Sequence, residues 1–304
     1  MDSAQAQGAG VSAAVQETKA EAGAPLLQAD GVSIQFGGLK ALTDFNLSVR
    51  QGDLQGLIGP NGAGKSTAFN VLTGVYQPTQ GEVRVGGQRV NGWLPHQINH
   101  LGLARTFQNI RLFRALTALD NVKVACRAQG ALHPEGVGLG AKMKGAFINY
   151  RDWWRALLLT PRFQQEEREL TQQAEHLLEV MGLSHRRDEE ARNLPYGEQR
   201  RLEIARALGT QPKVLLLDEP AAGMNTREKA DLMVLIRKLR DDFKLGVLVI
   251  EHDMKLVMGI CECITVLDHG ETIARGAPAQ VRSDRKVIEA YLGDSYLESQ
   301  GGAA

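Results

Sequence analysis

The sequence predicts an α/β fold in which a parallel core sheet carries an antiparallel β subdomain. Three observations support this fold class. A glycine-rich turn joins an apolar run to a helix-like run within residues 54–72, two later apolar runs end in acidic residues at 214–219 and 247–251, and short β-type runs occupy 26–49 and 81–90. Long apolar strands between helices are typical of a buried parallel sheet, and short strands with turn residues between them are typical of an antiparallel one.

The composition indicates a globular protein without a strong overall charge. Its 304 residues are 43% hydrophobic, which suffices for the core of one large α/β domain or of two lobes. Lysine plus arginine and aspartate plus glutamate both number 35, so the formal net charge is zero and no basic field indicates nucleic acid. No apolar run approaches the roughly 18 residues that cross a bilayer, and the N-terminus lacks a basic segment followed by an apolar one. We therefore expect a cytoplasmic protein.

The N-terminal part predicts a tail followed by a small sheet. Residues 1–24 are rich in Ala, Gln, Gly, Ser and Glu and almost free of large apolar side chains, so we expect a disordered tail. The β-type runs at 26–34, 42–49 and 81–90 predict a small antiparallel sheet. Phe36 ends the first run, where it is either an aromatic that stacks on a base or an ordinary apolar strand residue.

The stretch from 59 to 67 has the pattern of a P-loop. It reads Gly59, Pro60, Asn61, Gly62, Ala63, Gly64, Lys65, Ser66 and Thr67. Its glycines let the backbone wrap around a polyphosphate, and the helix that starts near Gly64 turns its positive end toward the same charge. Lys65 is expected to reach the β- and γ-phosphates, Ser66 to bind Mg²⁺ and Thr67 to add a phosphate contact. The sequence therefore predicts a site for a nucleoside triphosphate with Mg²⁺, beside the antiparallel sheet.

The middle of the chain is less informative by itself. Residues 104–113 mix polar and apolar types around Gln108, and their meaning depends on the motifs that follow. In an insertion between 127 and 169, the pair Trp153-Trp154 is flanked by arginines. We favour packing under the insertion over contact with lipid headgroups or with a partner.

A helix and a second anion-binding turn precede the acidic strand. Helical periodicity covers 167–181, and Gly182 is predicted to stop this helix. The later turn consists of Leu194, Pro195, Tyr196, Gly197, Glu198 and Gln199, and it opens a helix whose Leu202, Ala205 and Leu208 are expected to face inward. Such a turn presents free N–H groups and a helix N-terminus to an anion.

Two buried strands are predicted to deliver polar side chains to one edge of the core sheet. Val214–Leu217 is followed by Asp218 and Glu219, and a later apolar run ends at His252. Asp218 is expected to hold Mg²⁺ through water, and Glu219 to orient or deprotonate the attacking water. His252 is expected to hydrogen-bond the γ-phosphate. An acidic pair is often only a helix cap, but the order of P-loop, helix-start turn and acidic strand argues against that alternative.

The three cysteines do not predict a metal site. Cys126, Cys261 and Cys263 lack CxxC spacing. We favour reduced core or surface thiols over a metal role for the pair Cys261 and Cys263.

In this order the motifs resemble the ATPase subunit of an ABC transporter, over roughly residues 26–292. The resemblance implies a P-loop NTPase with a RecA-like core sheet, which hydrolyses ATP with Mg²⁺ to drive transport. It implies an adenine-stacking aromatic at Phe36, a Walker A loop at 59–67, a Q-loop at Gln108, a signature at 194–199, a Walker B strand at 214–219, a D-loop at Ala222–Asn225 and a switch at His252. Glu219, His252 and Gln108 are then the implied catalytic residues, and Ser66, Gln108 and Asp218 the implied metal-binding residues.

The same resemblance implies a division of the chain. The tail 1–24 precedes an ATPase domain at 25–285, and a C-terminal helix and tail follow at 286–304. Within the ATPase domain, 25–107 and 191–285 form the nucleotide-binding core, and 108–190 forms a helical subdomain with an insertion.

Several longer phrases narrow the resemblance. FGGLKAL, ARTFQNIRLF, NLPYGEQRRLEIARAL, DEPAAGMN and IEHDMKLVMGI resemble the larger ATP-binding subunit of branched-chain amino acid importers. The family signature LSGGQ is altered, because Pro195 replaces a serine that binds γ-phosphate and Tyr196 replaces the first glycine. The resemblance implies a peripheral protein at the cytoplasmic face of the inner membrane. Its implied partners are a second, non-identical ATPase, two permease subunits and, indirectly, a periplasmic binding protein.

Other functions remain open at this point. Relatives of these importers are expected to carry other small amino acids, amides, urea or aromatic acids. The ATPase of a lipopolysaccharide-type exporter is a second reading, and a soluble ABC ATPase that acts on nucleic acid or ribosomes is a third. The third is disfavoured by the neutral charge and by the absence of tandem cassettes or long coiled-coil insertions. A nucleotide switch without turnover is disfavoured because Glu219 is present.

Overall fold

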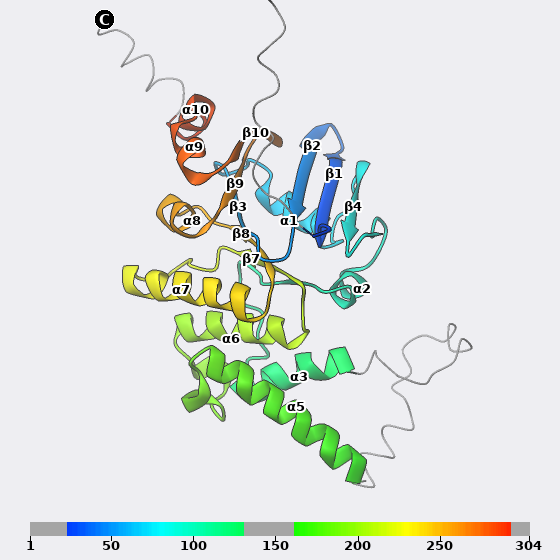
Figure 1. Cartoon of the computed structure of the whole chain (residues 1–304), viewed down its shortest axis with the longest axis vertical. Coiled ribbons are helices and arrows are strands. Elements are labelled where there is room, and N and C mark those ends of the chain that lie inside the picture. Colours follow the sequence, from blue (N-terminus) through cyan, green and yellow to red (C-terminus); the bar gives the residue numbers. More distant parts are fainter. Residues whose placement is uncertain (1–22, 131–160, 293–304) are drawn as a thin grey trace, which may run out of the picture.

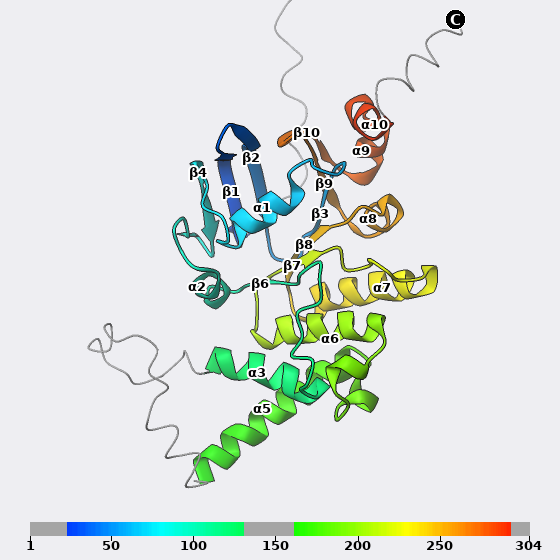
Figure 2. The same cartoon turned by 180° about the vertical axis from the view of Figure 1, so that it is seen from behind.

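The computed structural model describes residues 23–130 and 161–292. Residues 1–22 of the predicted tail and the pair Trp153-Trp154 lie outside the described residues. The described part forms two sheets and a set of helices, which Figure 1 shows from one side and Figure 2 from behind. No helix in residues 23–130 or 161–292 is both long and apolar enough to cross a bilayer.

The smaller sheet is antiparallel and is built from the first β-type runs. Its four strands are β1 (Leu27–Phe36), β2 (Leu39–Val49), β4 (Gln80–Val85) and β5 (Gln88–Arg89), in the order β2-β1-β4-β5. Alternate residues such as Leu27, Phe45 and Leu47 are buried, as the period of two in a half-buried strand requires. The predicted antiparallel sheet is therefore present.

The larger sheet is the core of the molecule. Its six strands are β3 (Leu54–Ile58), β6 (Leu103–Arg105), β7 (Val214–Asp218), β8 (Gly246–Ile250), β9 (Cys263–Asp268) and β10 (Glu271–Gly276). Their order is β10-β9-β3-β8-β7-β6, and all neighbours are parallel except β10 and β9. Every residue of β3, β7 and β8 is buried. Continuous apolar runs form central strands because both faces of the sheet are covered.

The two faces of the larger sheet pack against different layers. Along β7, Val214 and Leu216 join a core with α1 (Lys65–Leu72) and the antiparallel sheet, whereas Leu215 and Leu217 join a core with α6 (Tyr196–Gly209), α7 (Thr226–Asp242) and α8 (Met254–Ile260). The alternation follows from the pleat, which sends successive side chains to opposite faces. In Figure 1, α1 and the small sheet lie on one side of the core strands, and α7 and α8 lie on the other.

The remaining helices form a helical layer and a C-terminal cap. The layer consists of α3 (Ala118–Gly130), α5 (Pro161–Val180) and α6, which lie together at one end of the molecule (Figure 2). Short helices follow β5 and β10, namely α2 (Pro95–His100), α9 (Pro278–Ser283) and α10 (Arg285–Leu292). Helix α5 begins before the predicted 167–181 because Gln164–Glu166 are good helix formers that lack apolar periodicity. It ends just before Gly182, which has φ +67.

Candidate functional site

The glycine-rich loop connects β3 to α1 and depends on the absence of side chains. Gly59, Gly62 and Gly64 have φ values of 153°, 83° and 99°, in the region that favours glycine. A Cβ atom on Gly59 would lie 2.1 Å from the carbonyl oxygen of Leu267, and one on Gly64 would lie 2.7 Å from that of Ala41. The loop is therefore pressed against two neighbouring strands, and α1 begins directly after it at Lys65.

Lys65 lies over the loop that precedes it. Its Nζ donates to the carbonyl oxygens of Gly59 and Pro60, at 2.7 and 2.8 Å. Burial lowers the pKa of this ammonium, and the nearby carboxylate of Glu219 opposes that shift. Ser66, the next residue of α1, is exposed, and Thr67 is half-buried. An anion that enters the loop therefore meets a positive group already held between the loop and an acidic residue.

Asp218 ends β7 and is held by an arginine from the neighbouring strand. Arg105, the last residue of β6, places Nη2 at 2.8 Å from Asp218 Oδ2, and both side chains are nearly buried. Nη1 of Arg105 donates to Asn70 Oδ1 on α1 at 2.7 Å and to Oγ1 of Thr73, the C-cap of α1, at 3.3 Å. The guanidinium also packs against the rings of Phe69 and Phe107. Arg105 therefore joins the helix after the P-loop to the acidic end of β7.

Three predicted catalytic residues lie together at the carboxyl edge of the core strands. Gln108 Nε2 donates to Glu219 Oε2 at 3.0 Å. His252 Nδ1 lies 3.9 Å from the same carboxylate oxygen. Glu219 has φ 47, a left-handed conformation that is uncommon for a residue with a side chain, and its N–H donates to the carbonyl oxygen of Ile250. The backbone at the end of β7 thus turns sharply at the residue expected to orient water.

A second carboxylate lies beneath this group. Glu251 is fully buried, and its Oε1 accepts a hydrogen bond from the N–H of Ala221 at 2.8 Å. Its Oε2 lies 3.8 Å from His252 Nδ1. Burial raises the pKa of Glu251, whereas the hydrogen bond from Ala221 lowers it. Glu251 therefore links the segment after Glu219 to His252.

The signature residues lie on the other face of the sheet. Pro195 is the N-cap of α6, Tyr196 is the first helical residue and is 45% exposed, and Gln199 Nε2 donates to the carbonyl oxygen of Leu194 at 2.8 Å. Glu198 accepts from Arg186 Nε at 3.0 Å. Within the described residues no hydrogen bond or ion pair joins 194–199 to the P-loop, and Figure 1 shows α6 and α1 separated by the core strands. One chain therefore does not bring its signature to its own P-loop.

Phe36 lies at the end of β1, on the antiparallel sheet rather than at the carboxyl edge of the core strands. It is 45% exposed, and its ring meets Tyr76 edge to face, with centroids 5.1 Å apart. An exposed, braced aromatic ring can receive a flat base. The D-loop residues Ala222–Asn225 follow Glu219, and Asn225 caps α7 by accepting from the N–H groups of Arg227 and Glu228.

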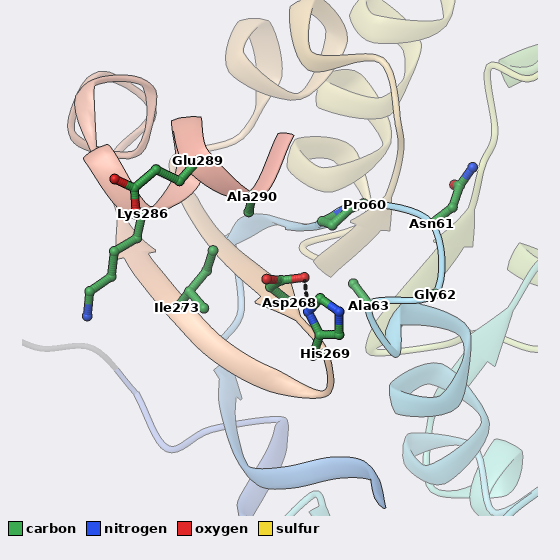
Figure 3. Close-up of a pocket in the computed structure, with 10 residues that line it drawn as sticks. All are labelled: Pro60, Asn61, Gly62, Ala63, Asp268, His269, Ile273, Lys286, Glu289 and Ala290. Atoms are coloured by element: carbon green, nitrogen blue, oxygen red, sulfur yellow. Dashed lines mark ion pairs between the residues drawn. The ribbon is translucent and has the colours of Figure 1, made fainter. Parts of the chain in front are cut away.

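A cavity of about 710 Å³ adjoins the outer side of the P-loop (Figure 3). It lies between the loop, the turn from β9 to β10 and helix α10. Its lining residues are Pro60, Asn61, Gly62, Ala63, Asp268, His269, Ile273, Lys286, Glu289 and Ala290. His269 Nδ1 lies 2.8 Å from Asp268 Oδ1 at its rim. Because Lys65, Gln108 and Glu219 do not line it, the cavity is separate from the group of polar residues described above.

Three residues of the site were not singled out in the sequence. Arg105 was read only as part of a mixed segment, and Arg200 and Glu203 only as part of a helix. All three are buried or nearly so and contact the Q-loop or the acidic strand. The sequence did contain a signal for the pair on α6. Positions 200 and 203 lie on the same helix face as the apolar Ile204 and Ala207, which indicates that their charged side chains face the core.

Family models match most of the chain. A model described as ABC transporter matches residues 42–222, and one described as branched-chain amino acid ATP-binding cassette transporter matches residues 271–296. The high-affinity branched-chain amino acid transport ATP-binding protein BraF of Pseudomonas aeruginosa is 44% identical over 271 residues, which cover 89% of this chain and 99% of BraF. LivG of Escherichia coli K12, with the same description, is 43% identical over the same shares.

More distant relatives share the same architecture. The lipopolysaccharide export system ATP-binding protein LptB of Haemophilus influenzae is 31% identical over 89% of this chain and 98% of LptB. A solved nucleotide-free ATP-binding cassette from an ABC transporter superposes with a TM-score of 0.71 at 30% identity, over 89% of this chain and all of that one. The ADP conformation of the cassette MJ1267 gives a TM-score of 0.71 at 31% identity, over 89% and 99% of the two chains. The P-loop NTPase fold predicted from the sequence is confirmed, and the chain belongs to the ABC transporter family as one of its ATP-binding cassette ATPases.

Proposed function

We propose that this chain is the energy-coupling subunit of an importer for branched-chain or related amino acids. The observation that carries ATP hydrolysis is the contact of Gln108 and His252 with Glu219, beside the P-loop. The solute class is supported by the match of residues 271–296 and by the descriptions of BraF and LivG. The lipopolysaccharide exporter subunit has lower identity, so the exporter reading has less support.

Each residue of the group has a proposed task. Lys65 exchanges its bonds to the loop carbonyls for the β- and γ-phosphates of ATP, and Glu219 orients the attacking water. Gln108 holds the Glu219 carboxylate in place, and His252 donates to the γ-phosphate. Catalysis is then mainly positioning and charge stabilisation.

The donor set fits a magnesium ion. Asp218, Ser66 and Gln108 offer a carboxylate, a hydroxyl and an amide oxygen, which are the hard oxygen ligands that Mg²⁺ takes. Asp218 uses Oδ2 for Arg105, and its Oδ1 makes no hydrogen bond within residues 23–130 and 161–292. That oxygen is therefore the one available to a water on the ion. When bound, Mg²⁺ would neutralise charge on the phosphates.

The complete ATP site is proposed to need two chains. The signature and the P-loop lie on opposite faces of the sheet, so each ATP would be bound between the P-loop of one ATPase and the signature of another. Pro195 lacks both a hydroxyl and an N–H for phosphate. We therefore propose a second, non-identical ATPase, whose signature completes the more active site at Lys65 and Glu219 of this chain.

The segment after Gln108 is the proposed contact with a permease. Residues 109–114 precede α3, and Phe113 is 49% exposed there. Two permease subunits would bind through a cytoplasmic helix each, and a periplasmic binding protein would select the solute. The chain would then be a peripheral protein at the cytoplasmic face of the inner membrane.

The first experiment isolates the complex. The Glu219→Gln variant, which is expected to bind ATP and to hydrolyse it slowly, is recovered from detergent-solubilised membranes with ATP, and its partners are identified by mass spectrometry. We expect two permeases and a second ATPase, and ATP-dependent uptake of leucine, isoleucine or valine by the wild-type complex in vesicles with its binding protein. Recovery of this chain only with itself, with soluble partners or with an exporter's permeases would contradict the importer.

The asymmetry of the two sites has its own test. Glu219→Gln is expected to lower transport-coupled hydrolysis at least roughly a hundredfold, as loss of a group that acts on the reacting water does. Glu262→Gln, at an exposed carboxylate that pairs with Arg240, is the matched control and should leave hydrolysis unchanged. Hydrolysis near the wild-type rate in Glu219→Gln would show that the other site is the more active one.

A further inference from the structure

Two oppositely charged side chains are buried on α6, the helix that begins within the signature (the signature helix). Arg200 and Glu203 lie one turn apart on α6, are 2% and 1% exposed, and pair at 3.1 Å between Nη1 and Oε2. Burial raises the pKa of Glu203, whereas hydrogen bonds from the backbone N–H groups of Arg111 and Phe107 and the charge of Arg200 lower it. Buried charges are costly unless they are well paired, so their contacts show what this pair does.

The pair binds the backbone of the Q-loop at both ends. Arg200 donates from Nη1 to the carbonyl oxygen of Phe107 at 2.5 Å, and from Nη2 to that of Gln108. Glu203 Oε1 accepts from the N–H of Phe107 at 3.4 Å and from the N–H of Arg111 at 3.2 Å. Figure 2 shows this segment running from β6 along α6 to α3. Residues 107–111 are thus held against the signature helix by charge-assisted hydrogen bonds.

The same pair lies between the signature and the side chain of Gln108. On one side, the guanidinium of Arg200 lies 5.5 Å from the ring centre of Tyr196, which is exposed in the signature. On the other side, the side chain of Gln108 donates to Glu219. A chain of direct contacts therefore runs from the signature through Arg200 and the Q-loop backbone to the carboxylate expected to orient water.

We propose that Arg200 and Glu203 are positioning residues that transmit a movement of the signature helix to Gln108, and through it to Glu219. The inference rests on the proposed function, in which the signature contacts ATP held by the second chain. Binding at one ATP site would then set the position of Gln108 at the other. A purely structural pair would stabilise α6 without any effect on hydrolysis beyond folding.

A double replacement separates the two roles. Buried ion pairs replaced by apolar residues of similar size often keep or increase stability, whereas removal of one partner destabilises. We therefore expect Arg200→Met or Glu203→Leu alone to lower the melting temperature. Arg200→Met with Glu203→Leu should recover part of the loss, since the Q-loop N–H and carbonyl groups that the pair bound stay unpaired. In the assembled transporter, this double variant should bind a fluorescent ATP analogue within about twofold of wild type, yet show a kcat lower by roughly ten- to a hundredfold.

A mutant cycle with Gln108→Ala tests whether the pair acts on kcat through Gln108. If the pair acts through Gln108, adding Gln108→Ala to the double variant should cause little further loss of kcat, whereas independent effects would multiply. Arg201→Met, which replaces the neighbouring arginine of α6, is the matched control. It should leave kcat nearly unchanged and lower the melting temperature only by the loss of one long hydrogen bond to the carbonyl oxygen of Met181. If the double variant does not fold, Arg200→Lys replaces it in the cycle, because it keeps the charge and loses the two-pronged contact.

Three results would overturn the inference: a wild-type kcat in the folded double variant, a wild-type kcat in Arg200→Lys, or losses that multiply with Gln108→Ala. Failure of the proposed function is recognised separately. A wild-type complex that hydrolyses ATP without amino acid uptake would contradict the importer, and the cycle would still be measured on its ATPase activity.

Discussion

Arg105 shows how a single side chain can connect three separate parts of the chain. It ends β6, donates to Asn70 on α1 and to Thr73 at the C-cap of that helix, and pairs with Asp218 at the end of β7. Two aromatic rings cover its guanidinium. Arg105, which has no proposed role in the chemistry, therefore ties the P-loop helix to the acidic strand.

Replacement of Arg105 tests how much this connection contributes to stability. Arg105→Met leaves the nearly buried carboxylate of Asp218 without its partner, so we expect a loss of about 3–5 kcal/mol in the free energy of unfolding. Arg84→Met is the matched control, because Arg84 pairs with Glu82 on the surface, and it should cost less than about 1 kcal/mol. Urea unfolding of both variants measures the difference. Equal, small losses would show that Asp218 does not depend on Arg105.

Glu219 shows a different use of a single residue. Its positive φ costs conformational energy. The hydrogen bond from its N–H to the carbonyl oxygen of Ile250 on β8 holds the backbone in this conformation. The turn directs the carboxylate to Gln108 and His252 rather than along the strand. A residue that stores strain at this point is consistent with the water-orienting role proposed for it.

At the scale of elements, the P-loop depends on close packing as well as on glycine's freedom. Gly59 and Gly62 both have positive φ, but their surroundings differ. A Cβ atom on Gly59 would meet the backbone of Leu267 on β9, whereas one on Gly62 would have no neighbour within 4 Å. The two positions therefore separate conformational strain from steric exclusion.

We expect Gly62→Ala to lower the free energy of unfolding by about 1–2 kcal/mol, from left-handed strain alone. Gly59→Ala should lower it by about 3 kcal/mol or more, because the loop or the end of β9 must also move. Thermal unfolding measures both, and binding of a fluorescent ATP analogue shows whether the loop keeps its shape. Equal losses in the two variants would mean that the loop moves away from β9 without cost.

At the scale of the whole molecule, the cysteines report on the integrity of the core. Cys126 lies in the core between α3 and α6, Cys261 lies between α8 and β9, and Cys263 is only partly buried at the start of β9. Burial raises the pKa of Cys126 to about 11 and that of Cys261 to about 12. In residues 23–130 and 161–292 no group of three or more His, Cys, Asp or Glu side chains is placed to hold a metal ion.

The thiols should therefore react in two phases with an aromatic disulfide reagent. Thiolate is the reactive form, so at pH 8 Cys263 should react first, and Cys126 and Cys261 only as the fold opens. Denaturant should make all three react together, and Cys263→Ser should remove only the fast phase. Fast reaction of all three cysteines in native buffer would contradict the burial of Cys126 between α3 and α6 and of Cys261 between α8 and β9.

The sequence predicted the parts of this molecule that are local in the chain. The P-loop, the altered signature and the acidic strand end are each contiguous, and their chemistry follows from residue types at fixed spacing. The central strands were also predictable, because β7 and β8 are uninterrupted apolar runs that are buried on both faces. The short strand β6 and the helix α2 were not predicted, since three to six residues carry too little periodicity.

Tertiary structure decided how these parts meet. The sequence by itself determined the nucleotide-binding motif, the parallel core and the family, because each is written in contiguous residues. Only the fold brought Arg105 to Asp218, Gln108 to Glu219, and Arg200 and Glu203 to the Q-loop. It also placed the signature on the face opposite the P-loop. These relations depend on the order of strands in the sheet and on which face each helix covers, and residue spacing along the chain does not specify either.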